Sequence, residues 1–105
     1  MVVNDPALTA RLAQTFTTWF GADRVAPEPP TAGGEDFARY GLTTDRVPIL
    51  TWWVGSAAPD KIAEAKRTGV PLPSNHSANF APVPEPTIKA GVISMTAAAL
   101  ELLAR

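Results

Sequence analysis

The sequence predicts an α/β fold whose sheet is incomplete within this chain. Residues 47–55 form a continuous apolar run, which is typical of a strand covered on both faces by helices. Apolar residues at helical spacing near both ends of the chain predict the covering helices. Apart from a poor candidate at residues 24–26, no second strand accompanies the first, and an isolated pair of strands is only marginally stable. We therefore expect the strand to pair with another segment of a longer protein or with a second copy.

The first helix is predicted over residues 5–20. Asp5 suits the N-cap, Pro6 suits the first helical position, and Gly21 ends the helix. Its apolar residues fall on one stripe that we expect to pack in a core: Leu8, Leu12, Phe16, Trp19 and Phe20.

Residues 34–41 predict a short helix that carries Glu35 and Asp36 in its first turn. Two roles are open for this acidic pair. The carboxylates suit the positive end of the helix, and adjacent carboxylates behind the glycine pair at 33–34 also suit presentation to a functional site.

The second half of the chain predicts two more helices, which are joined by a proline-rich loop. Residues 59–68 indicate a polar surface helix, in which Glu64 and Arg67 are placed to pair across one turn. The last helix is expected from Thr87 to Ala104. Because it is apolar around most of its circumference, we expect it to be buried or heavily covered.

The composition indicates a single globular domain and argues against several classes of function. The chain has 105 residues, of which 46% are hydrophobic and 18% are charged, and its net charge is −1. Without a basic stripe, it is poorly suited to bind nucleic acid or an anionic membrane. It contains no cysteine, and neither a membrane span nor a signal peptide is recognisable. We expect a cytoplasmic protein.

His76 is the only histidine in the chain, and it lies in a loop rich in serine and asparagine at residues 74–80. A neutral histidine on a stiff loop is a common metal ligand. A surface histidine without a function is the other interpretation of the same loop. Together with Glu35 and Asp36, His76 forms the candidate constellation of the sequence. One histidine cannot make a metal site alone, so enzymatic function would need residues from elsewhere.

Four segments, taken in order, carry a resemblance to a known family. They are the Gly-Gly-Glu-Asp-Phe motif at 33–37, the end of the apolar run at 53–55, the histidine loop at 74–80, and the proline-rich helix start at 84–91. With the terminal helix, they resemble the C-terminal part of the metal-dependent amidohydrolases. These form the aminoacylase/carboxypeptidase zinc peptidase family, which includes hippurate hydrolases and indole-acetyl-amino-acid hydrolases.

The resemblance implies a fold as well as an activity. It implies that residues 1–105 are one segment, the C-terminal part of a three-layer α/β/α metallopeptidase-type catalytic domain. The order of elements would be helix, short acidic helix, buried strand, surface helix, histidine loop and long terminal helix. The family's lid or dimerisation domain is absent from this segment.

For the site, the resemblance implies that His76 is a ligand of a two-metal centre, holding zinc or manganese. Glu35 and Asp36 match the family's acidic turn and would shape or support the site, while Asn75 and Ser77 would orient the ligand or touch the substrate. The stretch departs from a common pattern in which proline follows the serine. The family's other ligands, including a cysteine, and its general base come from an N-terminal part.

The resemblance therefore implies hydrolysis of the amide bond of N-acyl amino acids or related peptides, without turnover by this chain alone. Its partner would be the missing N-terminal catalytic portion. The alternative is a non-catalytic α/β module that associates through its exposed strand. The two hypotheses differ in what they expect of His76. The first needs it as a metal ligand, whereas the second expects that its substitution changes nothing.

Overall fold

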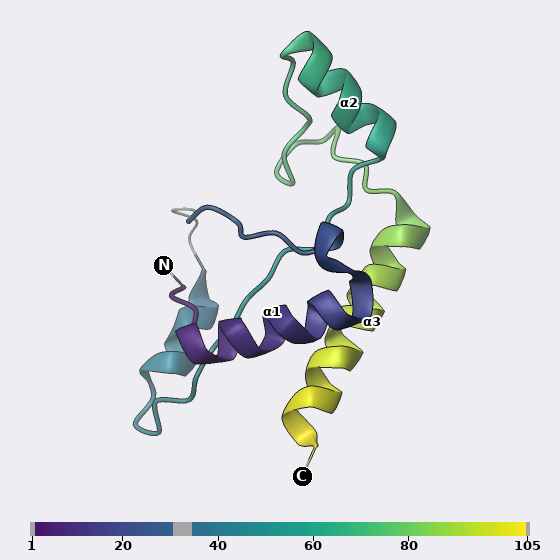
Figure 1. Ribbon diagram of the computed structural model, residues 1–105. Coiled ribbons are helices and arrows are strands. Elements are labelled where there is room, and N and C mark those ends of the chain that lie inside the picture. The colour runs from purple at the N-terminus through teal and green to yellow at the C-terminus, as the bar shows by residue number, and fades with distance from the viewer. Residues whose placement is uncertain (1, 31–34, 105) are drawn as a thin grey trace. The chain divides into compact units, whose positions relative to one another are not determined.

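The computed structural model describes residues 2–30 and 35–104, and Figure 1 shows that their regular structure is helical. Three α-helices and two 3₁₀-helices follow one another along the chain. They are α1 (Pro6–Phe20), η1 (Ala22–Arg24), η2 (Asp36–Leu42), α2 (Pro59–Thr68) and α3 (Pro84–Leu103).

The predicted α/β fold is wrong, because the described residues contain no β-strand. The run at 47–55 has no regular structure, and Arg24, in the poorer strand candidate, ends a 3₁₀-helix. The same finding overturns the three-layer α/β/α arrangement that the family resemblance implied. A strand needs backbone partners, and an apolar composition does not supply them.

The run at 47–55 is instead held by the start of the chain. The Asp5 backbone N–H donates to the Ile49 carbonyl at 2.9 Å. The Asn4 side-chain amide accepts from the Thr51 N–H at 2.9 Å and donates to the Thr51 carbonyl at 2.8 Å. One side chain thus satisfies both backbone groups of Thr51, as a neighbouring strand would.

The chain divides into two compact units. The first is Met1–Trp53 with Ser94–Arg105, and the second is Val54–Ile93. Helix α3 contributes its C-terminal half to the first unit and its N-terminal half to the second.

The core of the first unit lies between α1 and the C-terminal half of α3. Leu12 and Phe16 of α1 are buried against Ala97 and Ala98 of α3. The partly buried side chains around them are Leu8, Phe20, Val25, Leu50 and Trp52. The predicted packing of the α1 stripe is therefore confirmed for Leu12 and Phe16, whereas Trp19 is 51% exposed.

Helix α1 begins and ends where its local sequence predicts. An Asp5 carboxylate oxygen accepts from the Leu8 N–H at 2.8 Å, which satisfies an amide that has no partner within the helix. Gly21 ends the helix at φ 94°, a conformation that favours glycine, and its N–H donates to the Thr17 carbonyl.

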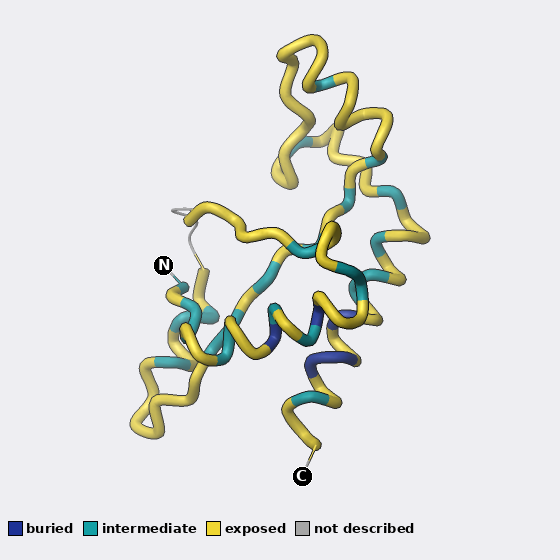
Figure 2. The backbone as a smooth tube through the Cα atoms, viewed as in Figure 1, coloured by how far each residue is buried: buried dark blue, intermediate teal, exposed yellow. Residues whose placement is uncertain are grey.

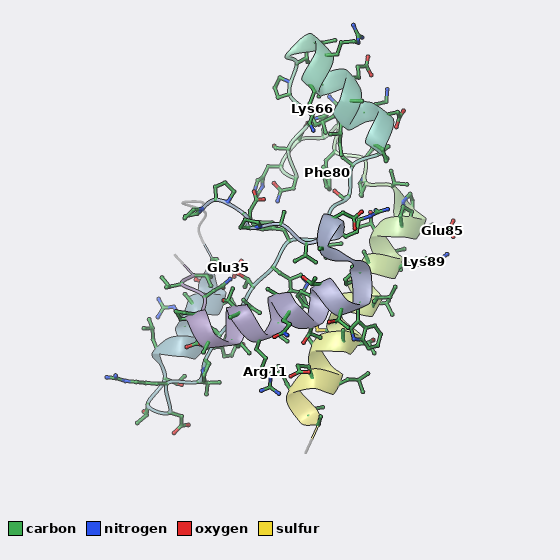
Figure 3. The ribbon with its side chains drawn as sticks, in the orientation of Figure 1. Arg11, Glu35, Lys66, Phe80, Glu85 and Lys89 are labelled. Carbon is green, nitrogen blue, oxygen red and sulfur yellow. The ribbon has the colours of Figure 1, made fainter. Side chains whose placement is uncertain are left out.

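Trp52 connects the apolar run at 47–55 to both α1 and α3. Its ring centroid lies 5.3 Å from that of Phe16, and its indole N–H donates to the Ser94 hydroxyl at 3.2 Å. At the far end of the same interface, the Arg11 guanidinium donates to the Glu101 carboxylate and backbone carbonyl, each at 2.6 Å. The sticks of Figure 3 show Arg11 reaching toward the C-terminal half of α3.

Helix α3 is longer than predicted and is not buried. It starts at Pro84 rather than Thr87. Its buried residues are all small, namely Ser94, Ala97 and Ala98. Five of its large apolar side chains are more than half exposed: Ile88, Val92, Met95, Leu100 and Leu103. The expectation of a covered helix is therefore wrong for this chain, as the largely exposed tube in Figure 2 illustrates.

Among the described residues, α3 is also the one helix long and apolar enough to cross a membrane. Length and composition alone support that possibility, and a single helix that passes such a test is weak support. Glu85 and Lys89 pair at 2.6 Å on its first turns, where both side chains are well exposed.

The second unit contains the polar helix predicted at residues 59–68. Helix α2 is exposed except for the half-buried Ala65, and Gly69 ends it in the left-handed conformation at φ 74°. Its ion pair joins Lys61 to Glu64 at 3.4 Å, whereas the sequence predicted that Glu64 would pair with Arg67.

Candidate functional site

The acidic pair at residues 35–36 lies at the start of a short helix, as predicted, but the helix is of the 3₁₀ type. Glu35 is the N-cap of η2, and its carboxylate accepts from the Phe37 N–H at 3.0 Å. Both acidic side chains are exposed. Of the two roles left open by the sequence, helix capping is thus observed for Glu35. The glycine pair at 33–34 lies outside the described residues.

Helix η2 packs against the apolar run through a glycine. A Cβ added at Gly41 would come within 3.1 Å of the Ile49 side chain, so the two elements approach closely here. The rings of Phe37 and Tyr40 lie in tilted contact on the same short helix, with centroids 5.5 Å apart and an interplanar angle of 51°. The sequence around the acidic pair therefore places it on a packed element of the first unit.

The histidine loop is built from two consecutive turns in the second unit. The Ser77 N–H donates to the Ser74 carbonyl at 2.9 Å, which closes the first turn around Asn75 and His76. The Phe80 N–H donates to the Ser77 carbonyl at 3.0 Å, which closes the second. Two backbone hydrogen bonds thus close the loop into consecutive turns.

The His76 imidazole is exposed and makes no hydrogen bond or ion pair within the described part of the chain. Asn75 is exposed as well, whereas Ser77 is half-buried. A free imidazole fits the requirement for a metal ligand, because a neutral ring offers one nitrogen lone pair to an ion. The orienting hydrogen bond that usually fixes such a ligand would come from outside this set of residues.

The structure assigns the predicted site residues to different units. Glu35 and Asp36 belong to the first unit, while Asn75, His76 and Ser77 belong to the second. Within residues 2–30 and 35–104, no group of three or more histidine, aspartate or glutamate side chains is arranged to hold a metal ion. A metal at His76 would need further ligands from another part of a protein.

An open apolar face on the C-terminal half of α3 is a feature that the sequence did not predict. It is formed by Met95, Thr96, Ala99, Leu100, Leu103 and Ala104. The signal for it was the breadth of the apolar surface of the last helix, which we interpreted as burial. A small groove of about 240 Å³ lies between α2 and the residues after it, with Lys61 and Glu64 in its wall.

No protein-family model matches this chain, and neither a characterised protein nor a solved structure is detectably similar to it. The resemblance to amidohydrolases therefore depends on the four sequence segments alone and stays a prediction.

Proposed function

We propose that this chain is the C-terminal portion of a metal-dependent amidohydrolase that cleaves the amide bond of N-acyl amino acids. In this proposal, His76 is one ligand of a zinc or manganese centre. A second portion of the protein supplies the other ligands and the general base. The chain by itself has no turnover.

The single observation that carries the proposal is the poor cover of the apolar side chains. The chain is 46% hydrophobic, yet its buried hydrophobic side chains, among those described, are Leu12, Phe16, Ala97 and Ala98. Large apolar side chains remain exposed on each unit, including Trp53 at 70% and Val70 at 65%. Exposed apolar surface on this scale marks a surface that another protein segment covers.

The state of the histidine loop supports the assignment of His76. Two turns hold the loop, while the imidazole itself has no partner among the described residues and is open to solvent. A ligand of this kind loses little freedom when it binds an ion, because the backbone that carries it is already ordered.

The resident metal would supply activation of water and polarisation of the amide carbonyl. The chain's own contribution is more limited. His76 would bind the ion through one ring nitrogen, and Asn75 beside it offers an amide to orient the imidazole or the substrate. Glu35 belongs to the first unit, where its carboxylate accepts the Phe37 N–H and caps η2.

The test is made on the native protein, captured from its source cells with an antibody against this chain. We expect an intact mass several times the 11.1 kDa of this chain, a bound divalent metal, and hydrolysis of N-acyl amino acids such as hippurate. His76→Ala should lower the metal content and abolish hydrolysis, whereas Arg67→Ala on the exposed face of α2 serves as the matched control and should change neither. A native mass of 11.1 kDa without metal or hydrolysis would overturn the proposal.

The exposed face of α3 supports a second candidate, a non-catalytic association module. Met95, Leu100 and Leu103 form an exposed apolar face that a second copy could also cover. This candidate expects a stable oligomer of the isolated chain in sedimentation or light scattering, with no change on His76→Ala. A monomeric chain over the micromolar range would exclude it.

A further inference from the structure

Helix α3 packs against α1 with its small side chains inward. In its C-terminal half, the buried or half-buried positions recur at intervals of three and four residues, as one face of a helix requires, and they are Ser94, Ala97, Ala98 and Glu101. The two alanines belong to the core of the first unit, and the Glu101 carboxylate accepts from Arg11 at 2.6 Å. The inner face of this half therefore buries no large apolar side chain.

The large apolar side chains lie on the opposite side of the same half. We call this side the outer face, and its residues are Met95, Thr96, Ala99, Leu100, Leu102 and Leu103, all of them exposed. At about 100° per residue, they span an arc of about 160° around the helix axis. None of them is charged, and Thr96 is the one polar residue among them. A surface helix of a globular protein has the reverse arrangement, with its apolar arc toward the core.

A single helix is too narrow to cover the outer face. The apolar stripe through which a helix packs against its neighbours is about 100° wide, and the seam of a coiled coil is narrower still. An arc of about 160° therefore needs a covering surface wider than one helix. Because burial of an unpaired charge is costly, the surface that lies against this uncharged face has to be uncharged as well.

The chain also exposes more surface than one ordinary pairing would cover. A folded protein of 11.1 kDa exposes about 5,700 Å², and two separate domains with the masses of the two units would expose about 6,800 Å². This chain exposes 8576 Å². The surplus over the larger of these references is about 1,800 Å². That is roughly twice the 800 Å² or so that each partner contributes to an interface of standard size, and it matches one side of a permanent interface.

We propose that the outer face of α3 is a permanent interface, covered by an uncharged apolar surface wider than one helix in the remaining portion of the same protein. The inference rests on the proposed function for the existence of that portion. It places α3 between α1 and that portion, and it favours the larger protein over pairing of two copies through α3.

The test uses the absence of cysteine from the sequence. Leu100→Cys and Leu102→Cys place a single thiol at either margin of the outer face, and Arg67→Cys on the exposed side of α2 is the matched control. Maleimide labelling of each thiol is followed at its own peptide by mass spectrometry. In the native protein, both α3 thiols should react at least about tenfold more slowly than in this chain alone, because labelling follows the open fraction of a site. The control thiol should react equally in both.

Three results would overturn the inference. The first is protection of only one α3 thiol, which would indicate a cover one helix wide. The second is equal labelling of both thiols in the native protein and in the chain alone. The third is protection in the chain alone that disappears on dilution, which would assign the outer face to a second copy.

Metal content and hydrolysis are measured on the same native samples, so the interface and the proposed function fail separately. Protection of both thiols without metal or hydrolysis would refute the proposed function and leave the interface in place. A metal-containing, active protein whose α3 thiols label freely would refute the interface alone.

Discussion

Leu12→Ala is the most direct perturbation of the small core. Leu12 is 2% exposed and is the largest of the fully buried side chains among those described. Truncation of a buried leucine costs the transfer energy of the lost methyl groups plus a term for the cavity. We expect a loss of about 3 kcal/mol in the free energy of unfolding, toward the low end for leucine, because the open surroundings of this core allow partial collapse.

Leu103→Ala makes the same chemical change at a position that is 78% exposed. Its expected effect is within about 0.5 kcal/mol. The assay is urea unfolding followed by tryptophan fluorescence, since Trp52 packs on Phe16 in the same core. For an m-value of about 1–3 kcal/mol/M, Leu12→Ala should lower the midpoint by roughly 1–3 M. Equal midpoints for the two variants would refute the assignment of Leu12 to the core.

Two further predictions concern the polar contacts of the first unit. Asn4→Ala removes three hydrogen bonds between the Asn4 side chain and Thr51 and should cost about 1–2 kcal/mol in urea unfolding; retention of full stability would show that water replaces the amide without loss. Arg11→Ala breaks the ion pair with Glu101. Because the Arg11 side chain is 50% exposed and the Glu101 side chain is 36% exposed, the substitution should lower the free energy of unfolding by no more than about 1 kcal/mol. That cost should shrink in 1 M salt, and a salt-independent effect would assign it to the lost packing of the Arg11 stem.

The helices were predictable where their signals are local. Asp5, Pro6 and Gly21 act on the backbone within one turn of themselves, so the bounds of α1 could be predicted from neighbouring residues. The same holds for the end of α2 at Gly69.

The run at 47–55 could not be predicted in the same way. Its apolar residues indicate that it needs cover, and they do not say which backbone provides it. A strand would have required partner strands, and the partner present in this chain is the side chain of Asn4. For α3, the apolar surface was predicted correctly. The prediction that this surface is buried was wrong, because burial depends on how much other protein lies against the helix.

The candidate site was predicted only in part. The order of the histidine loop follows from serine and asparagine, which favour turns through their own backbone bonds. The position of Glu35 at the start of a short helix was predicted, whereas its side-chain cap on the Phe37 N–H was not. A metal site depends on residues that converge from different parts of a protein, so a single candidate such as His76 cannot define one.

The bond between Asn4 and Thr51 also has a consequence for solubility. An unpaired apolar segment with high β-propensity is a template on which identical segments from other molecules add and aggregate. Because the Asn4 amide occupies both backbone groups of Thr51, an incoming chain has to displace it before the middle of this segment is available. A single amide side chain thus protects the backbone at the middle of this apolar segment from pairing with another molecule.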